Sequence, residues 1–218
     1  MRYAIMIAVG ILSFSCRDIL PLESSSTIAG YQVKGIVTGR DGLPIDAVNV
    51  RVYYYYDLLR NTPIDTLPVL VTDSTKIVDI AVYTSSFHLV REIFLGYRSP
   101  GRVPHYQWDG RDDNNKPVPN GKYFVRYVID TTIVKFSTII IDGHISATSD
   151  SSGHFTLTSD RLPVGEVFDH YLSNNTYEGT YRVLPEIDLV VEKALLIKSY
   201  AGIHLESGTI ISVALKLE

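Results

Sequence analysis

Apolar and polar residues alternate along several short segments of the chain, which is the pattern of a half-buried β-strand. The clearest segment is 122–129, where the residues on one face are Tyr123, Val125, Tyr127 and Ile129. Residues 48–56 and 211–217 alternate in the same way. The best helical candidate is 190–198, but its apolar residues suit a buried strand equally well. The pattern therefore predicts an all-β protein.

Turn residues between these segments indicate how the strands connect. Residues 31–56 predict a hairpin, because Asp41, Gly42 and Pro44 supply turn geometry between two alternating runs. Residues 78–82 and 87–93 predict a second hairpin. The sequence pattern does not determine the strand register of residues 166–200.

The first 15 residues have the layout of an export signal. Arg2 supplies a positive charge, and residues 4–12 are apolar. A transmembrane helix needs about 20 apolar residues, so this stretch is too short to span a bilayer. We interpret residues 1–15 as a signal peptide and residues 16–30 as a tether. The alternative is a cytosolic protein whose first strand is apolar.

The charge and cysteine content of the chain limit which partners are expected and what can stabilise the fold. The 218 residues include 20 Lys and Arg against 24 Asp and Glu, a formal net charge of −4. The charges are interspersed and form no basic run, so nucleic acid is not an expected partner. Cys16 is the single cysteine. A packed core, without disulfides, must therefore stabilise the fold.

The most informative segment is 106–129, which begins Tyr-Gln-Trp-Asp-Gly-Arg-Asp-Asp-Asn-Asn and ends in an alternating strand. It resembles the Trp-Asp-Gly motif of immunoglobulin-like (Ig-like) domains related to the flagellar hook-capping protein, FlgD. Those domains are β-sandwich modules on exported bacterial proteins, and they serve as scaffolds rather than catalysts. The resemblance therefore implies a non-catalytic module, with the single Trp108 packed in its core.

A second resemblance is split along the chain. Residues 33–52 resemble the opening of carboxypeptidase-regulatory-like domains, which are transthyretin-like β-sandwiches, and residues 148–165 resemble a later part of them. The two resemblances together imply that one sandwich is inserted in a loop of the other, which is inexpensive where the ends of a loop lie close together. The expected domains are a split carboxypeptidase-regulatory-like sandwich at 31–73 plus 143–218 and a FlgD-type Ig-like domain at 74–142.

Cys16 directly follows the apolar stretch and resembles the lipidated cysteine of bacterial lipoproteins. Ser15 fits the position before that cysteine, whereas Leu12 lies four residues before it instead of the usual three. The resemblance implies a lipid on Cys16 that anchors the protein in a membrane, at the outer membrane or cell surface. Cleavage without lipidation would instead give a periplasmic or secreted protein.

Candidates for chemistry are few. Asp109, Asp112 and Asp113 crowd one turn and would form a calcium loop in one reading. Their spacing does not match a calcium loop, so we expect these side chains to cap the turn backbone, with no metal bound. The six histidines have no zinc-ligand spacing, and no nucleotide-binding or nucleophile motif is present. We therefore predict no enzyme activity and no cofactor.

The expected function is that of a non-catalytic cell-envelope lipoprotein, acting as a structural, adhesive or protein-interaction module. Its expected partner is another envelope or surface protein, and a glycan is a further possibility. The alternative is a carbohydrate-binding surface lipoprotein that uses exposed aromatic residues. The candidate residues for that alternative are Trp108, Tyr53 and Tyr55, although core packing is the plainer role for each.

Overall fold

The computed structural model describes residues 30–64, 69–103 and 105–218. The expected signal peptide, Cys16 and all of the tether except Gly30 lie outside these residues. The described residues form fourteen strands and one short 3-10 helix, η1 (Ser159–Arg161), so the predicted all-β class is confirmed. Among them, no helix is long and apolar enough to cross a membrane.

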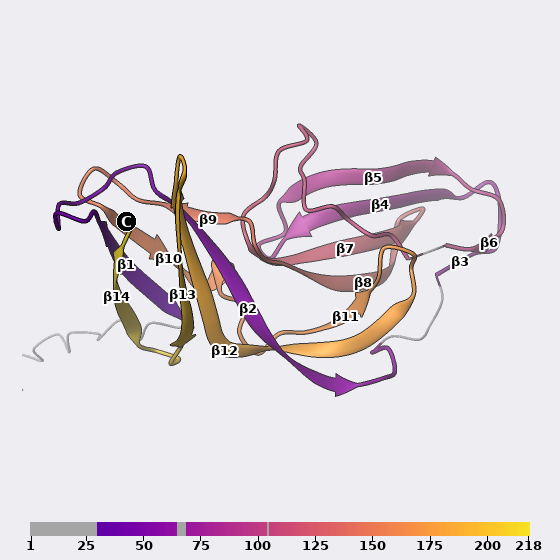
Figure 1. The fold of residues 1–218 in the computed structure, drawn as a ribbon. Helices are drawn as coiled ribbons and strands as arrows, with labels where there is room; N and C mark the ends of the chain where they lie inside the picture. Colours follow the sequence, from indigo (N-terminus) through magenta and orange to yellow (C-terminus); the bar gives the residue numbers. More distant parts are fainter. Residues whose placement is uncertain (1–29, 65–68, 104) are drawn as a thin grey trace, which may run out of the picture.

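One part of the chain, which we call the host unit (residues 30–64 and 142–218), contains two sheets (Figure 1). The first has the order β10-β1-β14, with β14 parallel and β10 antiparallel to β1. The second has the order β11-β12-β2-β9, and β13 also pairs with β12. The strands of the host unit are β1 (Gln32–Thr38), β2 (Asn49–Arg60), β9 (Ile145–Thr148), β10 (His154–Leu157), β11 (Val167–Tyr171), β12 (Tyr177–Lys193), β13 (Leu196–His204) and β14 (Ile210–Lys216).

The two host sheets enclose one hydrophobic core. Alternate residues of β1 and β2 point into it, because side chains on a strand alternate between its faces. Val33 and Val37 come from the first sheet, and Val50 and Val52 from the second, and all four are fully buried. Burial of such side chains contributes roughly 25 cal/mol per Å² of apolar surface and is the main stabilising term for a chain without disulfides.

The remaining described residues form what we call the inserted unit (residues 69–141). Its main sheet has the order β5-β4-β7-β8, and β3 and β6 pair separately. The strands are β3 (Leu70–Val71), β4 (Ile77–Thr84), β5 (Leu89–Tyr97), β6 (Gly101–Arg102), β7 (Gly121–Ile129) and β8 (Thr132–Ile141). A second core, separate from that of the host unit, contains the alternating residues Val78, Ile80, Val82, Tyr123, Val125 and Tyr127. Val69 and Val71 also pack in it.

The chain leaves the host unit after β2 and returns at β9, and these two strands are hydrogen-bonded neighbours. Asn49 pairs with Thr148 and Val50 with Ala147. The inserted unit therefore lies in the middle of a larger β structure, as Figure 1 shows with β3–β8 beside the host strands.

The predicted hairpin at 31–56 is wrong. The chain turns at residues 39–44, where Gly39 donates to the carbonyl of Leu43, but β1 and β2 then enter different sheets. β1 pairs with β10 and β14, and β2 pairs with β12 and β9. The physical reason is that both strands bury their valines against each other. Two strands that face each other across a core cannot also be neighbours in one sheet.

Residues 166–200, whose register was open, form β11, β12 and most of β13. The segment 190–198 is strand, turn and strand rather than helix. β12 is 17 residues long and pairs with three different strands, with register shifts between Thr180 and Tyr181 and between Val183 and Ile187. Such bulges bend a strand, which lets β12 extend from the host core toward the inserted unit.

Candidate functional site

The two units meet along a seam of buried polar contacts. Asn120 is fully buried, and its side chain bonds both parts of the host unit. Its amide nitrogen donates to the carbonyl of Val52 on β2. Its side-chain oxygen accepts a hydrogen bond of 2.7 Å from the backbone N–H of His144. The His144 ring nitrogen Nδ1 in turn lies 2.7 Å from the carbonyl of Val118. The side chains of Asn120 and His144 are therefore both hydrogen-bonded at the place where the chain re-enters the host unit.

Close backbone packing continues the seam at Gly121. Its φ of +140° is a conformation that L side chains rarely adopt, and a Cβ placed there would lie 2.2 Å from the carbonyl oxygen of Asp160. The next residue, Lys122, forms an ion pair of 2.7 Å with Glu166 of the host unit. The start of β7 is thus held against η1 without room for a side chain.

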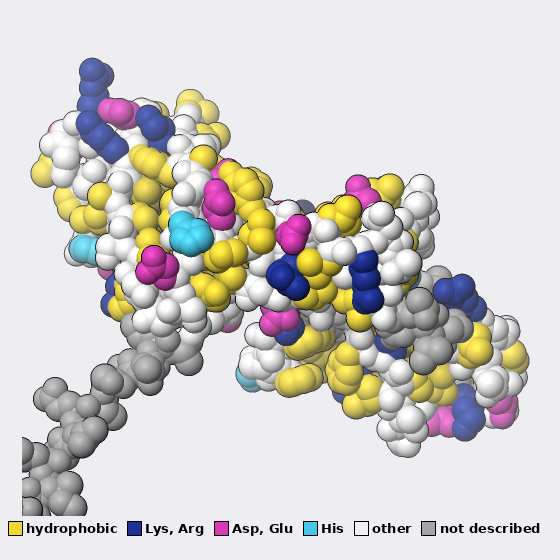
Figure 2. All heavy atoms as spheres, turned by 90° about the horizontal axis from the view of Figure 1, so that it is seen from below, with side chains coloured by type: hydrophobic (Ala, Val, Ile, Leu, Met, Phe, Trp, Pro, Cys, Tyr) yellow, Lys and Arg dark blue, Asp and Glu magenta, His cyan; other side chains and the backbone are white. Residues whose placement is uncertain are grey.

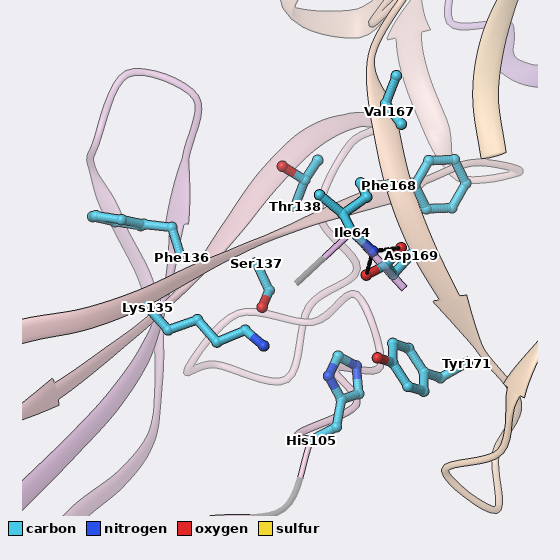
Figure 3. Close-up of a pocket in the computed structure, with 10 residues that line it drawn as sticks. All are labelled: Ile64, His105, Lys135, Phe136, Ser137, Thr138, Val167, Phe168, Asp169 and Tyr171. Carbon is cyan, nitrogen blue, oxygen red and sulfur yellow. Dashed lines mark hydrogen bonds between the residues drawn. The ribbon is translucent and has the colours of Figure 1, made fainter. Parts of the chain in front are cut away.

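A groove runs beside the contact between the edge strands β8 and β11. One lobe has a volume of about 200 Å³, and its walls include Lys135, Ser137 and Phe136 of β8 and Asp169 of β11 (Figure 3). A second lobe of about 260 Å³ is lined by Trp108, Ile140 and His170, among others. Both lobes share His105, Phe168, Asp169 and Tyr171. The groove is therefore built from both units and exists only where they meet.

His105 and Tyr171 connect the two units inside this groove. Their rings stack with centroids 4.0 Å apart and an interplanar angle of 21°. Burial lowers the pKa of His105, the nearby charge of Lys135 lowers it further, and Asp169 opposes the shift. The imidazole is therefore neutral near pH 7 and has one donor and one acceptor nitrogen.

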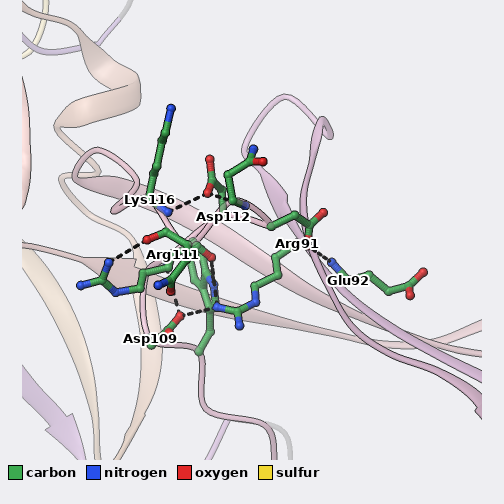
Figure 4. A network of polar contacts seen from close by, with 10 residues as sticks. Arg91, Glu92, Asp109, Arg111, Asp112 and Lys116 are labelled. Atoms are coloured by element: carbon green, nitrogen blue, oxygen red, sulfur yellow. Dashed lines mark hydrogen bonds and ion pairs between the residues drawn. The ribbon is translucent and has the colours of Figure 1, made fainter.

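The polar turn around Trp108 is tied together by its own side chains (Figure 4). Asp109 accepts from the backbone N–H of Arg111 and pairs with Arg91 at 2.8 Å. Asp112 accepts from the N–H groups of Asn114 and Lys116, and Asp113 from that of Glu92. These carboxylates cap backbone donors, and the described residues contain no group of three or more His, Cys, Asp or Glu that could hold a metal ion.

The three aromatic candidates lie in different places. Trp108 packs on the core of the inserted unit, edge-on to Tyr123 at 4.9 Å, and its indole N–H donates to the carbonyl of Arg111. Tyr53 and Tyr55 are on the solvent face of β2, 40% and 38% exposed, and Tyr55 donates to Asp188. Trp108 also lines the second lobe of the groove.

An aromatic cluster on the outer face of the main inserted sheet was not found from the sequence. Phe87 stacks on Phe124 with centroids 5.7 Å apart, and Phe136 meets both rings edge-on at 6.2 Å. Phe87 is 63% exposed and Phe136 43%. The ammonium of Lys122 lies 4.8 Å from the Phe124 ring. Phe124 lies between Lys122 and Arg126 on the polar half of the 122–129 alternation, and that position was the signal available in the sequence.

The free edges of the main inserted sheet are β5 and β8. β8 faces the host unit. On β5, the turn residue Asp113 accepts from the N–H of Glu92, which covers part of that edge. Leu95 and Tyr97 beyond it are 58% and 67% exposed. Over the face shown in Figure 2, acidic and basic side chains are interspersed among apolar clusters, with no continuous patch of one charge.

Comparison with known proteins identifies the inserted unit. The family model of the FlgD Ig-like domain matches residues 63–131. No curated protein and no solved structure matches the chain. The match ends at the turn before β8, which pairs with β7 and completes the sheet. The carboxypeptidase-regulatory-like resemblance of the host unit stays a prediction. Residues 63–131 thus match a FlgD Ig-like domain, in the middle of a larger all-β protein.

Proposed function

We propose that this protein is an exported lipoprotein, anchored through Cys16, and that its FlgD Ig-like domain presents a contact surface to another protein of the cell envelope. The contact surface is the outer face of the β5-β4-β7-β8 sheet, around Phe87, Phe124 and Phe136. The observation that carries this proposal is the exposed aromatic cluster on a domain whose family is non-catalytic.

The backbone at Phe87 supports a role for the cluster beyond folding. Phe87 has a φ of +62°, in the left-handed region that favours glycine and asparagine. This conformation costs on the order of 1–3 kcal/mol for a bulky residue. The turn is closed by hydrogen bonds between Thr84 and both Phe87 and His88. A strained turn that places a phenylalanine in solvent is better explained by a contact than by stability.

The charges around the cluster favour a protein partner over a glycan at this face. Arg126 is paired with Asp79 at 2.8 Å, and Lys122 with Glu166 at 2.7 Å. Few polar groups at this face are therefore left for the hydroxyls of a sugar. An apolar surface bordered by paired charges matches the core and rim of protein interfaces.

Site-specific photocrosslinking in intact bacterial cells tests the proposal. A benzophenone amino acid is placed at Phe87 or Phe136, and as a control at Leu58 on β2, which is 50% exposed. The proposal predicts one crosslinked envelope protein from positions 87 and 136 and none from position 58. Absence of any adduct, or the same adducts from all three positions, would refute the proposed contact face.

The alternative function, glycan binding at Tyr53 and Tyr55, is supported by the exposure of both rings on β2. Retention on insoluble polysaccharide that is lost in the double variant Tyr53→Ala, Tyr55→Ala would favour it. Retention that is absent, or unchanged in the double variant, would remove these two tyrosines as a glycan platform.

A further inference from the structure

We infer that the groove between β8 and β11 binds a single sugar ring of a neutral glycan. This site differs from Tyr53 and Tyr55, and it does not depend on the protein contact proposed for the outer face. Pockets at the boundary between two packed units are common sites for small ligands. The inference rests on the size of the groove, its mixture of hydrogen-bonding groups and the aromatic ring of Tyr171.

The first lobe has the size for one small polar ring. Its volume of about 200 Å³ equals that of roughly seven water molecules at bulk density. The second lobe, of about 260 Å³, adjoins it through four shared lining residues and would take a neighbouring unit.

The polar groups around the first lobe include both donors and acceptors, as Figure 3 shows. Lys135 supplies an ammonium donor, and Asp169 a carboxylate acceptor. Ser137 has a hydroxyl that can donate and accept, and neutral His105 has one nitrogen of each kind. Lys135 and Asp169 carry opposite charges, so together they give the lobe no overall preference for a simple anion or a simple cation. Sugar hydroxyls, which both donate and accept, fit such a mixture.

Asp169 is held in place and keeps capacity to bind a ligand. Its carboxylate accepts from the backbone N–H of Ile64 at 2.9 Å and from the hydroxyl of Thr180 at 2.6 Å. An ionised carboxylate has about four acceptor positions, so an additional hydroxyl can still donate to it. The two protein contacts fix its orientation before any ligand arrives, which lowers the entropy lost on binding.

The aromatic ring of Tyr171 on β11 supplies the apolar part of the site. The rings of Phe136 and Phe168 turn away from the groove, toward the outer face of the inserted sheet and the host core. The stack of Tyr171 on His105 restrains the tyrosine ring. A sugar ring has an apolar C–H face as well as hydroxyls around its edge, and aromatic rings bury such a face at little entropic cost.

Saturation-transfer NMR on the purified full-length chain tests the inference. The probes are the methyl glycosides of glucose, galactose, mannose and N-acetylglucosamine, with acetate and methylammonium as charged controls. The variants Lys135→Met and Ser137→Ala each remove one polar group of the groove. Lys198→Met, on β13, is the matched control, because its ammonium lies 3.8 Å from Glu218 outside the groove. Phe87→Asn tests independence from the outer face.

We expect saturation transfer to at least one glycoside, lost in Lys135→Met and Ser137→Ala and kept in Lys198→Met and Phe87→Asn. Circular dichroism checks that each variant is folded. The inference is overturned by transfer to no glycoside, by equal transfer in folded Lys135→Met and Ser137→Ala, or by displacement of the glycoside with acetate or methylammonium.

Discussion

The side-chain oxygen of Asn120 accepts a hydrogen bond of 2.7 Å from the backbone N–H of His144, and this contact joins the FlgD Ig-like domain to the strand that resumes the host unit. Asn120 is fully buried and also donates to Val52 on β2. One side chain therefore bonds both β2, after which the chain leaves the host unit, and the residue just before β9, where the chain returns.

Replacement of Asn120 by alanine should lower the free energy of unfolding by about 1–3 kcal/mol, because the N–H of His144 loses its acceptor in a buried place. Chemical denaturation followed by circular dichroism measures this. The control is Asn114→Ala in the exposed turn, which should change stability by less than about 0.5 kcal/mol. Equal effects of the two variants would show that the Asn120 contacts add nothing to the seam.

Alanine substitutions at two glycines with positive φ distinguish the cost of an unfavourable backbone conformation from the cost of close packing. Gly121→Ala places a Cβ 2.2 Å from the carbonyl oxygen of Asp160, whereas Gly165→Ala, with φ +84°, meets nothing within 4 Å. We expect Gly165→Ala to cost about 1–2 kcal/mol from conformation alone. Gly121→Ala should cost at least about 2 kcal/mol more, because overpacking adds to it. Thermal unfolding of both variants decides this, and a smaller loss for Gly121→Ala would contradict the close approach.

Trp108→Ala should destabilise the inserted unit by about 3–5 kcal/mol, as expected for a large aromatic residue packed on a core. The ring lies 4.9 Å from that of Tyr123, and its N–H bonds to Arg111. Trp108→Phe keeps an aromatic ring and should cost less. Denaturation followed by circular dichroism gives both values. A loss below about 1 kcal/mol for Trp108→Ala would mean that the ring contributes little to the core.

The pH dependence of stability should contain a contribution from His105. Burial lowers the pKa of this histidine below its ordinary value of 6.5, so the unfolded chain binds the proton more readily than the folded chain. The stability associated with neutral His105 is present above pH 6.5 and is lost as the pH falls below that value. The difference in unfolding free energy between wild type and His105→Gln should therefore shrink between about pH 7.5 and pH 5. A difference independent of pH would contradict this.

Local alternation predicted much of the fold. The buried faces of β4 and β7 follow directly from Val78, Ile80 and Val82 and from the tyrosines of β7, since each pattern is confined to one strand. The Trp108 turn also marked the FlgD Ig-like domain. In both cases the information lies within a few consecutive residues, and no distant partner has to be known.

Relations between distant segments could not be predicted in the same way. β1 and β2 look like a hairpin locally, but β1 pairs with β14, whose residue Ile211 lies opposite Val33. The groove brings His105 onto Tyr171 from another unit of the chain. Phe87 and Phe136 meet only because β4, β7 and β8 are neighbours. Pairing of this kind depends on the whole fold rather than on local pattern.

The most direct test of the proposed function is intact mass and metabolic palmitate labelling of the protein in a bacterial host, with wild type compared to Cys16→Ser. The account predicts a labelled chain that begins at Cys16, and no label on Cys16→Ser. An unlabelled, uncleaved chain in the cytosol would contradict the proposal that this is an anchored envelope protein.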